Sequence, residues 1–130
     1  MSNSYFHAQS SARKWGGVPE DYIAIHELID GSKQSFGDVR HRALLHNTWG
    51  VWLVQQVFGR TITIKKKTGG TKEVAVREVA EQHIIEDLGF IPSPGDWLQN
   101  MDIKAWMGGK QNRVIARGSF LDKTVKEKND

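Results

Sequence analysis

Hydrophobic residues recur with the spacing of an α-helix along most of this chain and alternate with polar residues in one region. Helical spacing predicts amphipathic helices, whereas alternation predicts β-strands with one buried face. The alternating region covers residues 61–76 and contains the pair Gly69-Gly70, which is typical of the turn of a β-hairpin. The pattern therefore predicts a mainly α fold with one β-hairpin.

The helical patterns predict four or five helices packed around a long central helix. This central helix is expected at residues 38–58, because apolar residues cover much of its surface and Gly59 follows it. The other helical segments are expected at residues 4–15, 19–29, 77–88 and 96–101. Since an isolated two-stranded hairpin is only marginally stable, its apolar face must pack on these helices or on a second copy of the chain.

The length of 130 residues fits one domain. We expect a single helical domain over residues 1–108 and a basic C-terminal extension at residues 109–130. Residues 102–130 hold seven Lys and Arg against four Asp and Glu, so this end alone accounts for the net charge of +3. Because the rest of the chain is balanced, the charge pattern does not favour a folded nucleic-acid-binding face.

The sequence contains no cysteine. This excludes disulfide frameworks, thiolate zinc sites and cysteine nucleophiles. The apolar runs are too short for a transmembrane helix, and the first residues do not have the pattern of a secretory signal. A cytoplasmic location is the expectation that follows.

Histidines and carboxylates occur together at helical spacing. Residues three or four positions apart lie on the same face of a helix, so each such pair can hold one metal ion or form one hydrogen bond. The pairs are His26 with Asp30, Asp38 with His41, and His83 with Asp87 or Glu86, and His46 adds a further imidazole.

Three of the histidines, His26, His46 and His83, are expected on the inward faces of three different helices. If they converge, they form a site of imidazoles and carboxylates that suits zinc, manganese or iron. The alternative is that each buried imidazole simply hydrogen-bonds a backbone carbonyl or a carboxylate. His7, close to the N-terminus, is expected to be exposed or to cap the first helix.

A catalytic version of this centre would hydrolyse a phosphoester or a nucleotide, with a metal-bound water as nucleophile. Asp30 or Asp87 would be a ligand or the general base, and Arg40 or Lys33 would contact a phosphate. Arg42 is expected instead in a charged first helical turn capped by Asp38. The expected metal ligands are His26, His46 and His83, with His41, Asp38 and Glu86 as further candidates.

Two other function classes stay open. The chain can be a non-catalytic module that binds a host or phage protein through its C-terminal extension, Trp106 and the hairpin. It can also be a nucleic-acid accessory protein that uses Lys65, Lys66 and Lys67 with the basic tail. These three lysines equally fit the protection of an exposed strand edge against aggregation.

Four ordered motifs carry a resemblance that spans residues 5–108. They are HAxSSAxKWGG from residue 7, PEDYxxIHxxxDxSK from residue 19, DxRHRALxH from residue 38 and EQHxxEDLGxIP from residue 81. On these motifs the chain resembles an uncharacterised family of small proteins common in bacteriophages and prophages. The resemblance implies a phage-associated protein but no particular activity. It places all five histidines, with Asp30, Asp38, Glu86 and Asp87, at motif positions.

Overall fold

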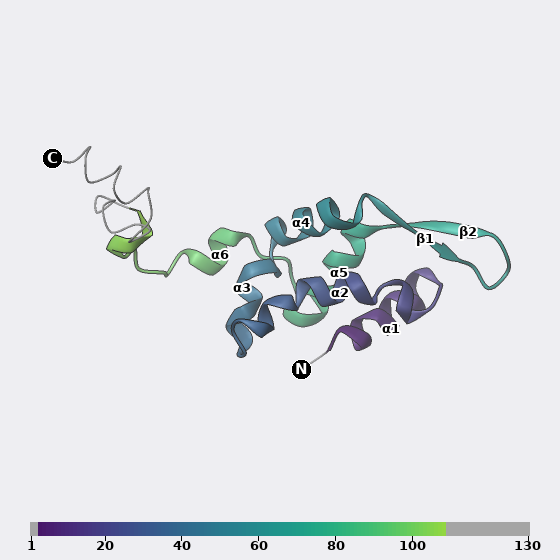
Figure 1. Cartoon of the computed structure of the whole chain (residues 1–130), viewed down its shortest axis with the longest axis horizontal. Helices are drawn as coiled ribbons and strands as arrows, with labels where there is room; N and C mark the ends of the chain where they lie inside the picture. Colours follow the sequence, from purple (N-terminus) through teal and green to yellow (C-terminus); the bar gives the residue numbers. More distant parts are fainter. Residues whose placement is uncertain (1–2, 109–130) are drawn as a thin grey trace. The chain divides into compact units, whose positions relative to one another are not determined.

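The computed structural model describes residues 3–108 (Figure 1). The expected basic extension at residues 109–130 lies outside the described residues. The chain divides into two units, Met1–Leu98 and Gln99–Asp130. The first unit contains the predicted helices and the hairpin, and in the second the described part has one 3-10 turn, Ala105–Met107.

Six α-helices and one two-stranded antiparallel sheet make up the regular structure of the described residues, so the predicted mainly α fold with one hairpin is confirmed. The elements are α1 (Ser4–Trp15), α2 (Ile23–Ile29), α3 (Arg42–Leu45), α4 (Thr48–Phe58), β1 (Thr61–Lys65), β2 (Thr71–Ala75), α5 (Val76–Leu88) and α6 (Pro94–Leu98). Short 3-10 turns occupy Pro19–Asp21, Gly31–Gln34 and Val39–His41. None of the described helices combines the length and the apolarity needed to cross a membrane.

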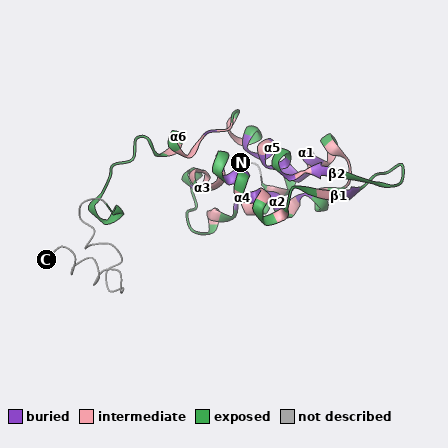
Figure 2. Cartoon of the chain, turned by 90° about the horizontal axis from the view of Figure 1, so that it is seen from above, coloured by how far each residue is buried: buried purple, intermediate pink, exposed green. Residues whose placement is uncertain are grey.

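The helix at the centre of the first unit is α5, which packs against α1, α2 and α4 (Figure 1). Val79, Ala80 and Ile84 on α5 are fully buried and join the core formed with Ile29 and Val54. The buried residues line the inner sides of the helices, and exposed residues cover the outer sides (Figure 2). The inner sides of α2, α4 and α5 therefore face one another.

The expected long helix at residues 38–58 is divided into the 3-10 turn Val39–His41, α3 and α4. The reason is Asn47, which is extended and caps α4 by accepting a hydrogen bond from the backbone N–H of Gly50. The Asn47 side-chain amide also donates to the carbonyl oxygen of Ala43 in α3. Asparagine favours such caps because its side chain competes with the helical backbone for hydrogen bonds. The break places His46 in the turn between α3 and α4, where it is fully buried.

Gly50 is required by the close approach of α4 to the end of α3. A Cβ atom at this position would lie 1.8 Å from the carbonyl oxygen of Leu45, which no side chain can tolerate. The tight turn is also held from outside, because the indole N–H of Trp97 donates to the carbonyl oxygen of His46 over 2.9 Å. These contacts determine where the His46 ring enters the core.

The hairpin pairs β1 with β2 in the register Ile62 to Val74 and Ile64 to Lys72. Ile64 and Val74 are almost fully buried, and Ile64 packs against the Gly16-Gly17 turn that follows α1. The apolar face of the hairpin is thus covered by helices of its own chain, which was one of the two expected arrangements.

Candidate metal centre

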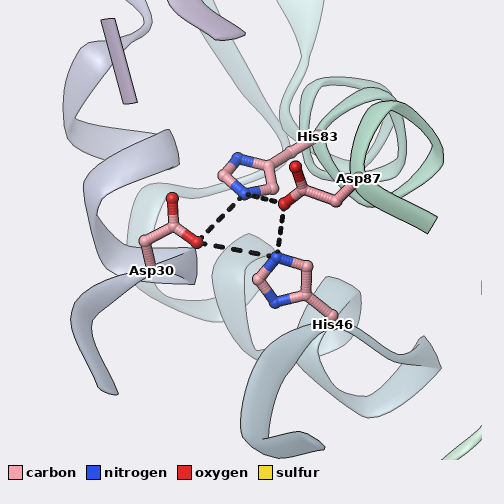
Figure 3. Close-up of side chains that lie close together, drawn as sticks. All are labelled: Asp30, His46, His83 and Asp87. Carbon is pink, nitrogen blue, oxygen red and sulfur yellow. Dashed lines mark hydrogen bonds and ion pairs between the residues drawn. The ribbon is translucent and has the colours of Figure 1, made fainter. Parts of the chain in front are cut away.

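Three parts of the chain bring four metal-binding side chains together (Figure 3). Asp30 stands at the C-terminal end of α2, His46 lies in the turn between α3 and α4, and His83 and Asp87 are one turn apart on α5. One ligand atom from each residue lies within 4.8 Å of all the others. Both imidazoles are fully buried, and the side chains of Asp30 and Asp87 are 8% and 4% exposed. We call these four residues the Asp/His cluster.

The ligand atoms of the Asp/His cluster form a closed ring in which each imidazole faces both carboxylates (Figure 3). The Nε2 atom of His46 lies 2.8 Å from Asp87 Oδ2 and 3.6 Å from Asp30 Oδ1. The Nε2 atom of His83 lies 3.2 Å from Asp87 Oδ2 and 3.3 Å from Asp30 Oδ1. A single ion at the centre of this ring would contact all four residues.

Both carboxylates are ionised at neutral pH. Burial raises the pKa of Asp87, but its contacts with the rings of His46, His7 and His83 outweigh burial and hold that pKa well below its usual range. The pKa of Asp30 is lowered in the same way, because the neighbouring His83 and Lys33 outweigh burial. The cluster therefore concentrates two negative charges in the protein interior.

Two cations stand beside these carboxylates at longer range. Lys33 Nζ lies 3.8 Å from Asp30 Oδ2, and Arg42 Nη2 lies 3.7 Å from Asp87 Oδ1. Neither distance is short enough for a strong hydrogen bond. Among the described residues Asp30 Oδ2 and Arg42 Nε are buried without a hydrogen-bond partner. Lys33 and Arg42 thus compensate the carboxylates only at long range, and the cluster could hold a metal ion at shorter range.

His41 adds a third imidazole at the edge of the cluster. Its Nδ1 atom lies 2.8 Å from the backbone carbonyl oxygen of Asp38, which can only accept, so Nδ1 carries the proton and donates. Its Nε2 atom lies 3.7 Å from Asp30 Oδ1 and has no hydrogen-bond partner within residues 3–108. His41 is therefore oriented with a free nitrogen toward the cluster.

His7 was expected to be exposed or to cap the first helix, and both expectations are wrong: its side chain is 1% exposed, and Asn3 is the residue that caps α1. Its Nδ1–H donates to Glu86 Oε1 over 2.7 Å, and its Nε2 atom lies 3.3 Å from Asp87 Oδ1. Burial lowers the pKa of His7, but the contacts with Asp87 and Glu86 outweigh burial and raise it overall. The ring stacks on His83 with 3.8 Å between centroids, so α1 forms one wall of the site.

His26 was expected as a metal ligand, but the structure places it behind His83. Its two nitrogens contact the Ser11 hydroxyl at 2.8 Å and His83 Nδ1 at 2.9 Å. Burial, followed by the neighbouring His83 and His7, lowers the pKa of His26 to about 3, so the ring is neutral. His26 therefore contacts His83 from behind and is not itself a member of the Asp/His cluster.

The remaining candidates are placed as follows. Asp38 and Arg40 form an exposed ion pair of 2.7 Å, and within the described residues neither reaches the cluster. Asp38 caps its turn as expected by accepting from the Arg40 backbone N–H. Glu86 binds His7, and Lys33 borders Asp30.

Sequence reasoning missed the roles of Arg42, Ser11 and Gln82. Arg42 was expected beside Asp38 but its guanidinium lies near Asp87, a residue distant in the sequence. Ser11 and Gln82 complete a hydrogen-bonded network behind His83. Their partners are contributed by distant segments, so local spacing contained no signal for them.

A helical protein with a buried cluster of histidines and carboxylates that can hold a metal ion is the class that fold and site define. The family model described as Domain of unknown function (DUF6915) matches residues 2–107, and the chain belongs to this family. The match covers every residue of the Asp/His cluster and its supporting network. No curated protein and no solved structure matches the chain.

Proposed function

We propose that this protein binds one divalent metal ion through Asp30, His46, His83 and Asp87. The observation that carries the proposal is the spacing of the four ligand atoms around the ring, which ranges from 2.8 to 3.6 Å. With metal–ligand bonds of about 2.0–2.2 Å, neighbouring ligand atoms are about 2.8–3.1 Å apart in octahedral geometry and about 3.3–3.6 Å apart in tetrahedral geometry. The cluster has the dimensions of a first coordination sphere.

The charges around the cluster support a cation at its centre. Asp30 and Asp87 are buried carboxylates, and isolated buried charges are costly unless they are paired or coordinate a metal. A divalent ion would compensate both at short range, which Lys33 and Arg42 do not achieve at 3.8 and 3.7 Å. His41, with its unpartnered Nε2 toward Asp30, supports the same interpretation, since a small shift would add a fifth ligand.

The donor atoms indicate which metals fit. Two imidazole nitrogens and two carboxylate oxygens form a set that suits zinc, manganese or iron, and the chain has no thiolate that would favour softer ions. Since four residues from three segments would share one ion, binding would also tie α2, the α3–α4 turn and α5 together. The metal would then contribute to folding stability directly.

Metal analysis of protein purified without a histidine tag tests the proposal. We expect near-stoichiometric metal in the wild type and in Asp38→Asn, and loss of the metal in Asp30→Asn. The two variants remove one negative charge each from neighbouring segments, but only Asp30 belongs to the cluster. A wild-type protein that takes up no zinc, manganese or iron after incubation with each ion would refute the proposal.

Hydrolysis of a phosphoester is a second candidate function, and one hollow favours it. A hollow of about 150 Å³ is lined by Phe6, His7, Ser10 and Glu86. His7 reaches from this hollow to Asp87. The side chain of Glu86 is 34% exposed, so it can accept a proton from a water molecule there.

A pair of variants on α5 tests hydrolysis. With bis(p-nitrophenyl) phosphate and manganese, we expect Glu86→Gln to lower the rate by roughly 10²–10⁴-fold, the usual contribution of a general base. Glu81→Gln should leave the rate unchanged, because Glu81 lies on the same helix and pairs with Arg77 at the surface. Metal-loaded wild type without phosphodiesterase activity would contradict hydrolysis of such esters and leave metal binding intact.

A further inference from the structure

Four polar side chains from three helices form a continuous series of hydrogen bonds that runs from the interior to the cluster residue His83. Gln82 contacts Ser11, Ser11 contacts His26, and His26 contacts His83. All four residues are buried, with at most 8% exposure. Each buried donor in such a chain needs an acceptor, so the positions of the protons can be worked out one by one.

The first step is the orientation of the Gln82 amide. Its nitrogen lies 3.1 Å from the carbonyl oxygen of His7 and 2.9 Å from Glu86 Oε1. A backbone carbonyl accepts only, and so does a carboxylate, so the amide NH2 must face these two atoms. The Gln82 carbonyl oxygen therefore faces Ser11.

The second step is the Ser11 hydroxyl, which has a single proton. Its oxygen lies 2.5 Å from Gln82 Oε1, and two oxygens approach so closely only with a proton between them. Ser11 Oγ also lies 3.1 Å from the backbone carbonyl oxygen of His7, which, like Gln82 Oε1, can only accept. The single Ser11 proton is therefore directed to these two oxygens, and chiefly to the closer one, on Gln82. Ser11 has no second proton for His26, so the contact of 2.8 Å between Ser11 and His26 requires His26 Nε2–H as the donor.

The third step passes through His26 to His83. His26 contacts a hydroxyl and another imidazole, and its buried ring is neutral, so it has one N–H, which is already on Nε2. His26 Nδ1 is therefore an acceptor, and His83 Nδ1 must donate to it over 2.9 Å. The fixed proton of His83 is thus on Nδ1, and Nε2 is the atom that faces Asp30 and Asp87 and is available to a metal ion between them.

We infer that Ser11, Gln82 and His26 are positioning residues that keep the proton of His83 on Nδ1 and so present Nε2 to the centre of the Asp/His cluster. The consequence for metal affinity rests on the proposed function, whereas the position of the proton does not. Metal-bound histidines generally donate their other N–H to a fixed acceptor, which sets the tautomer and orients the ring. Here the acceptor is Nδ1 of His26, another imidazole, and the Ser11 hydroxyl on α1 sets the tautomer of that ring.

The wild-type experiment is a long-range ¹H–¹⁵N correlation spectrum of the metal-free protein at a pH where its imidazoles are neutral. We expect His83 protonated on Nδ1 and His26 protonated on Nε2. A His83 proton on Nε2 would overturn the inference whether or not the protein binds metal.

The variant experiment compares Ser11→Ala with Ser10→Ala. The two serines are neighbours on α1, and Ser11 belongs to the hydrogen-bonded series that ends at His83. Ser10 lines the hollow beside His7 and accepts from Arg13, and within residues 3–108 it contacts neither this series nor the Asp/His cluster, so it is a control for tautomer and zinc affinity. Loss of the Ser11 oxygen removes the acceptor of His26 Nε2–H, so we expect a mixture of tautomers at His26 and His83. Zinc affinity should fall by roughly 10- to 100-fold, as for other changes behind metal ligands, and Ser10→Ala should match the wild type.

The outcomes separate the two proposals. Suppose that the wild type binds zinc, and that Ser11→Ala and Ser10→Ala have the same histidine tautomers and the same zinc affinity. The inference is then wrong, and the proposed metal centre stands. If the wild type shows the expected tautomers and binds no metal, the inference stands and the proposed function fails. Circular dichroism of both variants checks that their helices are intact.

Discussion

Removal of bound metal with EDTA is expected to lower the melting temperature of the wild-type protein strongly. A ligand that binds only the native state at about a thousand times its Kd adds about 4 kcal/mol of stability. For a unit of roughly 60–100 residues each kcal/mol corresponds to about 4–8 °C, so the expected decrease is roughly 15–30 °C. The measurement is a thermal unfolding curve recorded with EDTA and again after zinc is restored.

The matched controls for chelation are again the two aspartates. Asp38→Asn should show the same EDTA-dependent decrease as the wild type, since Asp38 is exposed and pairs with Arg40. Asp30→Asn should melt at the same temperature with and without EDTA. If wild-type melting is indifferent to EDTA and to added zinc, the histidines act as buried hydrogen-bonding residues and the metal centre is ruled out.

Asp87→Asn is expected to destabilise the protein by about 3–5 kcal/mol even without metal, the usual effect of breaking a buried ion pair. The Asp87 side chain is 4% exposed and contacts His46, His83 and His7. Asparagine has the same shape but lacks the charge, so Arg42 and these rings lose their shared anionic partner. Urea denaturation in the presence of EDTA isolates this effect from metal binding.

Asp38→Asn is the control for this variant as well. Asparagine caps a helical turn as well as aspartate does, and the Asp38 side chain is exposed, so the urea midpoint should stay at the wild-type value. Equal midpoints for Asp87→Asn and Asp38→Asn would show that Asp87 does not stabilise the fold electrostatically. A further prediction is that EDTA no longer shifts the melting of Asp87→Asn.

Local patterns in the sequence were sufficient for the helices whose signals are local. α1 ends at Trp15 before Gly16 and α5 ends at Leu88 before Gly89, as their spacing and their glycines predict. The alternation of apolar and polar residues likewise predicted the two strands of the hairpin, β1 and β2. Helical spacing also indicated that His83 and Asp87 share one face of a helix, because one turn of helix dictates that geometry.

Helix caps and tertiary contacts decided what helical spacing could not. Asn47 divides the segment at residues 38–58, and this break places His46 in the core opposite Asp87. The preference of this segment for one helix is worth only fractions of a kcal/mol per residue, so caps and packing override it. The tight contact at Gly50 exists only once α3 and α4 are packed.

The residues that form the candidate metal centre were likewise determined partly by the sequence and partly by the tertiary structure. The sequence by itself determined that His26 and His83 lie inside, because apolar neighbours set the inward faces of their helices, and it predicted the burial of His46 from a helix that the structure breaks before that residue. Only the tertiary structure decided that His26 stands behind His83, that His7 is buried, and that Asp30 faces both imidazoles of the cluster. The physical reason is that periodicity fixes the direction of a side chain relative to its own helix. Distances between helices depend on how their side chains pack against one another.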